Sequence, residues 1–244
     1  MSTKGVRTMF LLLAAIPVLA AAQGANQNPR VIPPNAEYSG LTYGEWAAEW
    51  WRAAFAVPVE GGVHPLFTGG AFDGENGIVF MSAPVLPAGS PITEILVTIP
   101  SGTRLFFPLV TVECSVFEDP PFHGDDEASL RACANDLLDV VSDPYAEING
   151  RPVNNPDAYR VESPLFRWGP LPADNTLGAP EGTESDAVAA GYYLMLPPLS
   201  VGVHEIIVRA AIDSFGLAVD ARFIVTVEPR GRGGVAGSVR RAQS

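Results

Sequence analysis

Two glutamates and three tryptophans stand close together near the start of the chain. Glu45 and Glu49 lie four residues apart, with Trp46, Trp50 and Trp51 beside them. In a helix, this spacing stacks the two carboxylates on one face. Burial beside tryptophan, together with repulsion between like charges, would raise the pKa of one carboxyl group, as a general acid requires. Glu45 and Glu49 are therefore candidate catalytic residues.

The same helix also fits a structural role, which we favour. Glu45 can cap the helix, and Glu49 can pair with Arg52 at the i,i+3 spacing. The tryptophans suit a buried core, since large aromatic side chains dominate protein interiors. The alternative is a surface on which a sugar stacks, with four candidate ligand-binding residues: Trp46, Trp50, Trp51 and Arg52.

A third candidate catalytic carboxylate is Glu113, which follows the apolar run LFFPLV and precedes Cys114. The sequence has no G-x-S-x-G elbow and no nucleotide-binding glycine motif. The remaining route to hydrolysis is a pair of carboxylates, as in glycoside cleavage, and Asp119 could also supply one of them.

The chain has three histidines: His64, His123 and His204. Imidazole and carboxylate together suit zinc, iron or copper. The histidines stand singly, however, and show neither H-x-H nor H-E-x-x-H spacing. A shared metal site is therefore kept only as an alternative, and we expect no cofactor.

Residues 1–22 have the pattern of a signal peptide. Lys4 and Arg7 precede an apolar run that is short for a membrane span, and three alanines supply a cleavage pattern. We expect an exported protein, secreted or periplasmic, with no membrane span after the signal is removed. In such a protein, Cys114 and Cys133 would form one disulfide.

The formal net charge of the chain is −12, and Lys4 is its only lysine. The acidity argues against nucleic-acid binding, which needs a basic surface. The lack of lysine in the mature chain excludes Schiff-base chemistry and a P-loop lysine.

Two helices are expected, near 42–56 and 125–141. Thr42 is a good N-cap, Glu45 completes a capping box, and Pro58 ends the first helix. The second helix shows one apolar face at i, i+3, i+4 and i+7, with Asp125 or Asp126 as its cap.

Short β-branched or aromatic runs separated by Pro and Gly turns surround these helices. They include three closing strands, at 188–196, 202–212 and 217–227, which fit an antiparallel meander. The pattern predicts a mainly β protein: an antiparallel β-sandwich of immunoglobulin-like or jelly-roll type with two inserted helices. We expect a single domain at 41–228, an extended arm at 23–40 and a disordered Gly/Arg tail at 229–244.

Five stretches carry a resemblance to a known family: YGEWAAEWW, LFFPLVTVECS, LRACA, the ING-RPV hairpin with YRVESPLF, and PPLSVGVHEIIV. Together they resemble a family of uncharacterised exported bacterial proteins, over Tyr43 to Val227. The last stretch also resembles the closing strands of immunoglobulin-like modules. The resemblance implies a secreted protein with Cys114 paired to Cys133, and it implies no activity.

The sequence therefore favours an exported binding or envelope-associated module, whose partner would be an extracellular polysaccharide or an envelope protein. One alternative is a secreted carboxylate-dependent hydrolase or lyase that acts on a polysaccharide. A second alternative is a metal-binding protein that uses the three histidines.

Overall fold

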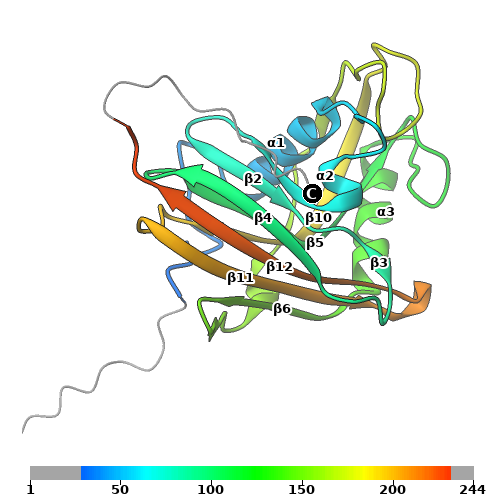
Figure 1. Ribbon diagram of the computed structural model, residues 1–244. Coiled ribbons are helices and arrows are strands. Elements are labelled where there is room, and N and C mark those ends of the chain that lie inside the picture. Colours follow the sequence, from blue (N-terminus) through cyan, green and yellow to red (C-terminus); the bar gives the residue numbers. More distant parts are fainter. Residues whose placement is uncertain (1–28, 232–244) are drawn as a thin grey trace, which may run out of the picture.

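The computed structural model describes residues 29–231, and two six-stranded, mostly antiparallel sheets with a few helices make up the fold (Figure 1). The expected signal peptide and the tail from residue 232 lie outside the described residues. In chain order the elements are α1 (Tyr43–Ala56), α2 (Pro65–Thr68), β1 (Gly70–Asp73), β2 (Ile78–Ser82), β3 (Leu86–Pro87), β4 (Thr93–Pro100), β5 (Arg104–Ser115), α3 (Glu127–Asp139), β6 (Ser142–Ile148), β7 (Arg151–Pro152), η1 (Pro156–Tyr159), β8 (Arg160–Glu162), β9 (Phe166–Trp168), β10 (Ser185–Leu196), β11 (Gly202–Ile212), η2 (Asp213–Phe215) and β12 (Leu217–Glu228).

Helix α1 begins with the expected capping box. The hydroxyl of Thr42 accepts from the backbone N–H of Glu45, and the Glu45 carboxylate accepts from the N–H of Thr42. The helix ends before Val57, whose backbone is extended because Pro58 follows it. Trp46 and Trp50 are each 1% exposed, so this helix is a core element, as its nearly continuous apolar circumference predicts.

The first sheet has the order β1-β2-β5-β10-β8, and β9 also pairs with β10. Strand β10 is its centre and is buried from Ala187 to Leu196. A strand covered on both faces has no need of alternating polar residues, which explains the run of small and apolar residues in β10.

The second sheet has the order β3-β12-β11-β6-β7, and β4 also pairs with β12. Strands β11 and β12 form the expected hairpin, but β10 belongs to the other sheet. The expected three-stranded meander is therefore wrong at its first strand. The antiparallel prediction also needs correction at two places, because β2–β5 and β4–β12 are parallel pairs.

Helix α1 and the second sheet lie on opposite faces of the first sheet (Figure 1). Neighbouring residues of β5 show this clearly: Phe106 contacts Trp46 of α1, whereas Phe107 contacts Phe223 of β12. Side chains that alternate along a strand point to opposite faces, so β5 joins both layers of the core.

Helix α3 is capped by Asp126, whose carboxylate accepts from the backbone N–H of Ser129. The Cys114–Cys133 disulfide joins it to β5, which confirms the expected bridge. Arg131 adds ion pairs with Glu127 of the same helix and with Glu162 of β8. Helix α3 is thus fixed against the first sheet by covalent and ionic contacts.

The described part of the N-terminal arm lies against the end of β10. The N–H of Ile32 donates to the carbonyl of Met195, and the hydroxyl of Tyr43 donates to the carbonyl of Ile32. None of the helices within residues 29–231 has the length and the apolar composition that crossing a membrane requires.

Candidate functional site

A mainly apolar cavity of about 450 Å³ opens where the ends of several elements meet. Its volume falls within the range of roughly 300 to 1,000 Å³ that is usual for small-molecule sites. The described residues that line it are Trp51, Phe55, Leu66, Phe67, Val85, Val110, Thr111, Val112, Glu113, Glu118, Pro121, Phe122, Leu137, Leu138, Val141, Thr176, Leu177, Ile212, Phe215 and Leu217.

The rim of the cavity carries exposed apolar side chains. Phe67, Val85, Phe122 and Phe215 are between 41% and 54% exposed, and all four belong to the lining. Large apolar residues grouped at the mouth of a pocket are typical of a binding site, whereas scattered ones are common on any surface. The entrance therefore suits an apolar ligand.

One wall of the cavity is the edge of β5 that faces away from β10. Strand β2 pairs with β5 only at residues 104–106. Further along, the backbone N–H of Val116 donates to the carbonyl of Asp186 in β10. The N–H of Ser115 donates instead to the carbonyl of Phe122, which lies on the opposite side of β5. Backbone groups in an antiparallel pair alternate in direction. The N–H and C=O groups of Thr111 and Glu113 therefore point away from β10, and no backbone partner for them occurs within residues 29–231.

Glu113 is the most unusual residue of the lining, because it is a carboxyl group in the core. It is 3% exposed, and its Oε1 accepts a hydrogen bond of 2.8 Å from the indole N–H of Trp168. Burial raises the pKa of Glu113 well above its ordinary value, and a hydrogen bond and like charge from Glu118 raise it further. Burial therefore favours the protonated form of Glu113, in which the carboxyl group can donate a hydrogen bond to Glu118.

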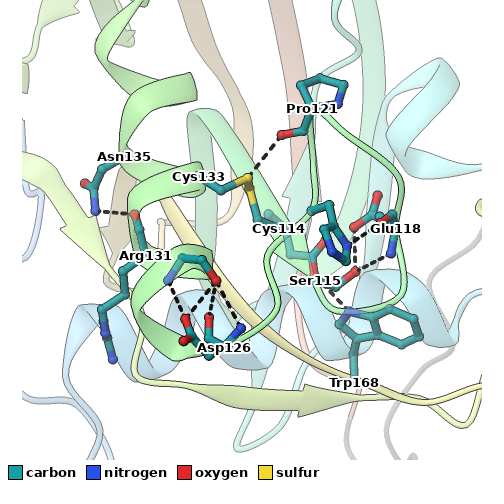
Figure 2. The surroundings of a disulfide bond; sticks show 12 residues. Cys114, Ser115, Glu118, Pro121, Asp126, Arg131, Cys133, Asn135 and Trp168 are labelled. Carbon is teal, nitrogen blue, oxygen red and sulfur yellow. Dashed lines mark hydrogen bonds between the residues drawn. A yellow bond between two sulfur atoms is a disulfide. The ribbon is translucent and has the colours of Figure 1, made fainter.

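Glu118 reaches Glu113 from the loop that follows β5. Its Oε2 accepts a hydrogen bond of 2.9 Å from the hydroxyl of Ser115, and its own N–H donates to the same hydroxyl. Figure 2 shows Ser115, Glu118 and Trp168 together on one side of the Cys114–Cys133 disulfide, with helix α3 on the other. The turn and the disulfide hold the carboxyl pair in place.

Two threonines add hydroxyl groups to the lining. The hydroxyl of Thr111 accepts from the indole N–H of Trp51 and donates to the carbonyl of Ala190. The Oγ1 of Thr176 is buried and has no hydrogen-bond partner among the described residues. Buried polar groups are usually satisfied, so Thr176 is a polar group that a ligand can engage.

The structure places Glu45 and Glu49 outside the lining of this cavity. The N–H and hydroxyl of Thr42 both donate to the Glu45 carboxylate and hold its pKa below the ordinary value. Glu49 forms an ion pair with Arg52, which also donates to the carbonyl of Arg167. Both carboxylates thus have the contacts of the structural interpretation, and their catalytic role stays a prediction.

The three tryptophans of α1 differ in their surroundings. Trp46 and Trp50 donate their indole N–H groups to the carbonyls of Tyr38 and Met81 and lie in the aromatic core. Only Trp51 among them lines the cavity. A sugar that stacked on Trp46 or Trp50 would require these rings to leave the core.

The three histidines lie on different elements, and each has its own partners. His64 caps α2: its Nδ1 accepts from the N–H of Leu66, so its Nε2 carries the proton that bonds the carbonyl of Ala54. His123 bonds the backbone oxygen of Glu118, and His204 bonds that of Ser200. Within the described range, no three His, Cys, Asp or Glu residues are grouped so that they could hold a metal ion.

The sequence pointed to Glu113 but not to its partners. Glu118 stands five residues further along in a loop, and Trp168 lies on a distant strand. An acid that follows a buried strand can be recognised from sequence, whereas a contact across more than fifty residues leaves no local pattern. Asp119, the neighbour that the sequence offered, does not line the cavity.

Comparisons with protein-family models, with curated proteins and with solved structures found no match for this chain. The cavity and its carboxyl pair are therefore the basis for a functional assignment.

Proposed function

We propose that this chain is an exported binding protein that holds a small, mainly apolar molecule in the cavity beside β5. The observation that supports the proposal is the cavity itself: about 450 Å³, lined largely by apolar side chains and containing a few convergent polar groups. This combination is typical of ligand sites. The disulfide fits an oxidising compartment outside the cytoplasm.

The finer fold class belongs to the same proposal. Contact between Phe107 and Phe223 across the two sheets supports a β-sandwich framework of immunoglobulin-like or jelly-roll type. In that framework, the ligand sits at one end of the layers, where loops and helix ends meet.

The experiment is a fluorescence titration of the secreted chain with N-phenylnaphthylamine, an uncharged apolar probe. We expect saturable binding that Leu177→Trp abolishes, because the larger ring fills the cavity. Val85→Trp at the rim is a second blocking variant. The matched control is Leu165→Trp, at an exposed leucine outside the lining, which should bind as the parent does. Absence of saturable binding to the folded parent would refute the proposal.

A second candidate function is carboxylate-dependent hydrolysis, supported by Glu113, whose pKa is raised by burial, beside Glu118. The two carboxyl groups are hydrogen-bonded, so they lie closer than the roughly 5 Å or more that separates the acids of glycosidases. They resemble instead two acids that share one proton, as in aspartic proteases. Hydrolysis of any peptide or polysaccharide that Glu113→Gln eliminates, in a variant that remains folded, would support this candidate. Unchanged turnover in Glu113→Gln would exclude it.

A further inference from the structure

We infer that the ligand is a cationic amphiphile, with its apolar body in the cavity and an ammonium end against the carboxyl groups of Glu113 and Glu118. The inference rests on the proposed binding function and adds the chemistry of the ligand's polar end. The apolar lining alone would accept any hydrophobic molecule of suitable size. The polar groups decide which end group is tolerated.

The first argument is the sign of the charge in the site. Two carboxyl groups line the cavity, and no Arg, Lys or His is among the described lining residues. An anionic end group would lose its hydration without gaining an opposite charge, which is costly in an apolar site. The formal net charge of −12 over the whole chain acts in the same direction. Fatty carboxylates are therefore disfavoured.

The second argument is hydrogen-bonding capacity. An ammonium group brings three donors and no acceptor, whereas each carboxylate offers about four lone-pair sites. Trp168 and Ser115 each occupy one site on the pair, and the hydrogen bond between the two carboxyl groups occupies another. Glu113 and Glu118 thus retain acceptor capacity, and bonds from a charged donor to a carboxylate are stronger than neutral ones.

The neutral polar groups of the cavity suit either a hydroxyl or an ammonium end. The Thr176 hydroxyl, buried and without a partner among the described residues, can accept from both. The edge of β5 offers a backbone C=O and N–H at Thr111 and at Glu113. Because these groups do not distinguish a cation from an alcohol, the discrimination depends on the carboxyl pair.

Binding of an ammonium end is coupled to the protonation of Glu113. Burial favours the protonated form of Glu113, whereas a cation beside it favours the ionised form, and a proton lost on binding passes to solvent. Glu118 from the loop and Trp168 from β9 contact the Glu113 carboxyl group, and Phe55 of α1 packs against the Trp168 ring. The hydroxyl of Tyr193 of β10 forms a hydrogen bond with that of Thr111 in the lining, and burial raises the pKa of Tyr193, so it stays neutral. Affinity for an amine should therefore rise with pH, while affinity for an alcohol should not.

The test compares octylamine, octanol and octanoate as competitors of N-phenylnaphthylamine on the secreted chain. The three have the same alkyl body and differ in the polar end. We expect octylamine to compete best, octanol less well and octanoate least. Glu118→Gln should weaken octylamine about tenfold or more while changing octanol less than threefold, because a charged hydrogen bond is lost. Glu75→Gln, at an exposed carboxylate outside the lining, is the matched control and should change neither.

Two results would overturn the inference while leaving the proposed function intact: octanoate that competes as well as octylamine, or unchanged octylamine affinity in both Glu118→Gln and Glu113→Gln. Failure of the uncharged probe itself to bind would instead refute the proposed function. The two failures are therefore distinguishable in one set of titrations.

Discussion

At the scale of single residues, Glu113 is the group whose environment departs most from that of an ordinary surface acid. Its side chain lies in the core between Trp168 and Glu118, and its pKa is raised mainly by burial. A carboxyl group that stays neutral can donate a hydrogen bond, which an ionised one cannot. This property underlies the hydrolytic alternative, whereas the binding proposal uses the acceptor oxygens of the Glu113 and Glu118 pair.

Glu113→Gln should behave as a permanent copy of the protonated acid. The Gln carbonyl can accept from Trp168, and its amide can donate to Glu118. Since the folded pKa of Glu113 is raised, its stabilising contribution is complete below the unfolded pKa and is lost as pH rises towards the folded pKa. We expect the variant to match the parent near pH 4 and to exceed its free energy of unfolding near pH 8, as measured by urea denaturation.

The control for this comparison is Glu75→Gln, whose carboxylate is exposed. It should change the free energy of unfolding equally at both pH values. A parent chain that gains stability relative to Glu113→Gln as pH rises would contradict the raised pKa.

At the scale of elements, α1 and β8 approach closely at Gly44. A Cβ atom built on Gly44 would lie 2.4 Å from the backbone oxygen of Glu162, closer than real contacts allow. Alanine favours a helix over glycine by about 1 kcal/mol in an open setting. Here Gly44→Ala should instead destabilise by roughly 1–3 kcal/mol, because backbone must move. Chemical denaturation measures this, and a stabilised variant would show that α1 can shift freely away from β8.

The disulfide is the second link between elements that can be tested. Cys114 and Cys133 are separated by 19 positions, and closing a loop of this size stabilises the fold by about 3 kcal/mol in the chain-entropy estimate. The double variant Cys114→Ala/Cys133→Ala should lose about that amount in urea denaturation. A loss below about 1 kcal/mol would mean that Arg131 and the apolar face of α3 hold the helix without the bridge.

The free edge of β5 makes a prediction for hydrogen exchange. The N–H groups of Val112 and Cys114 point to β10, whereas those of Thr111 and Glu113 point to the cavity. Amide exchange should therefore be faster at Thr111 and Glu113 than at their two neighbours. NMR exchange measurements resolve this alternation, and equal protection at all four amides would contradict an unpaired edge.

The starts of helices α1 and α3 could be predicted from the sequence, because the residues that cap each helix are close neighbours along the chain. Thr42 with Glu45 and Asp126 with Ser129 lie three residues apart, so each cap is contained within a single turn of chain. The place of β10 differs from the prediction, although its composition carries a clue: β10 is buried continuously from Ala187 to Leu196 and has no charged residue there, whereas β12 alternates. A strand buried on both faces belongs at the centre of a covered sheet and need not pair with the next strand along the chain. The cavity itself could not be foreseen, because residues from Trp51 to Leu217 build it.

At the scale of the whole molecule, the proposed ligand binding in the cavity would be coupled to the stability of the fold. Its walls come from both sheets, from all three α-helices and from the loops between them, so an occupant contacts most layers at once. A ligand that binds only the folded state stabilises it by mass action, by about 2.7 kcal/mol at one hundred times the dissociation constant. For a chain of this size, that corresponds to a rise of roughly 5–10 °C in Tm.

Thermal unfolding of the protein with and without saturating octylamine measures this effect. The parent and Leu165→Trp should both show the rise, and Leu177→Trp should show none, since its cavity is filled. A rise that persists in Leu177→Trp would place the binding site elsewhere on the molecule. A rise with divalent metal instead of amphiphile would favour the histidine alternative, for which His64, His123 and His204 would have to act at separate places in the fold.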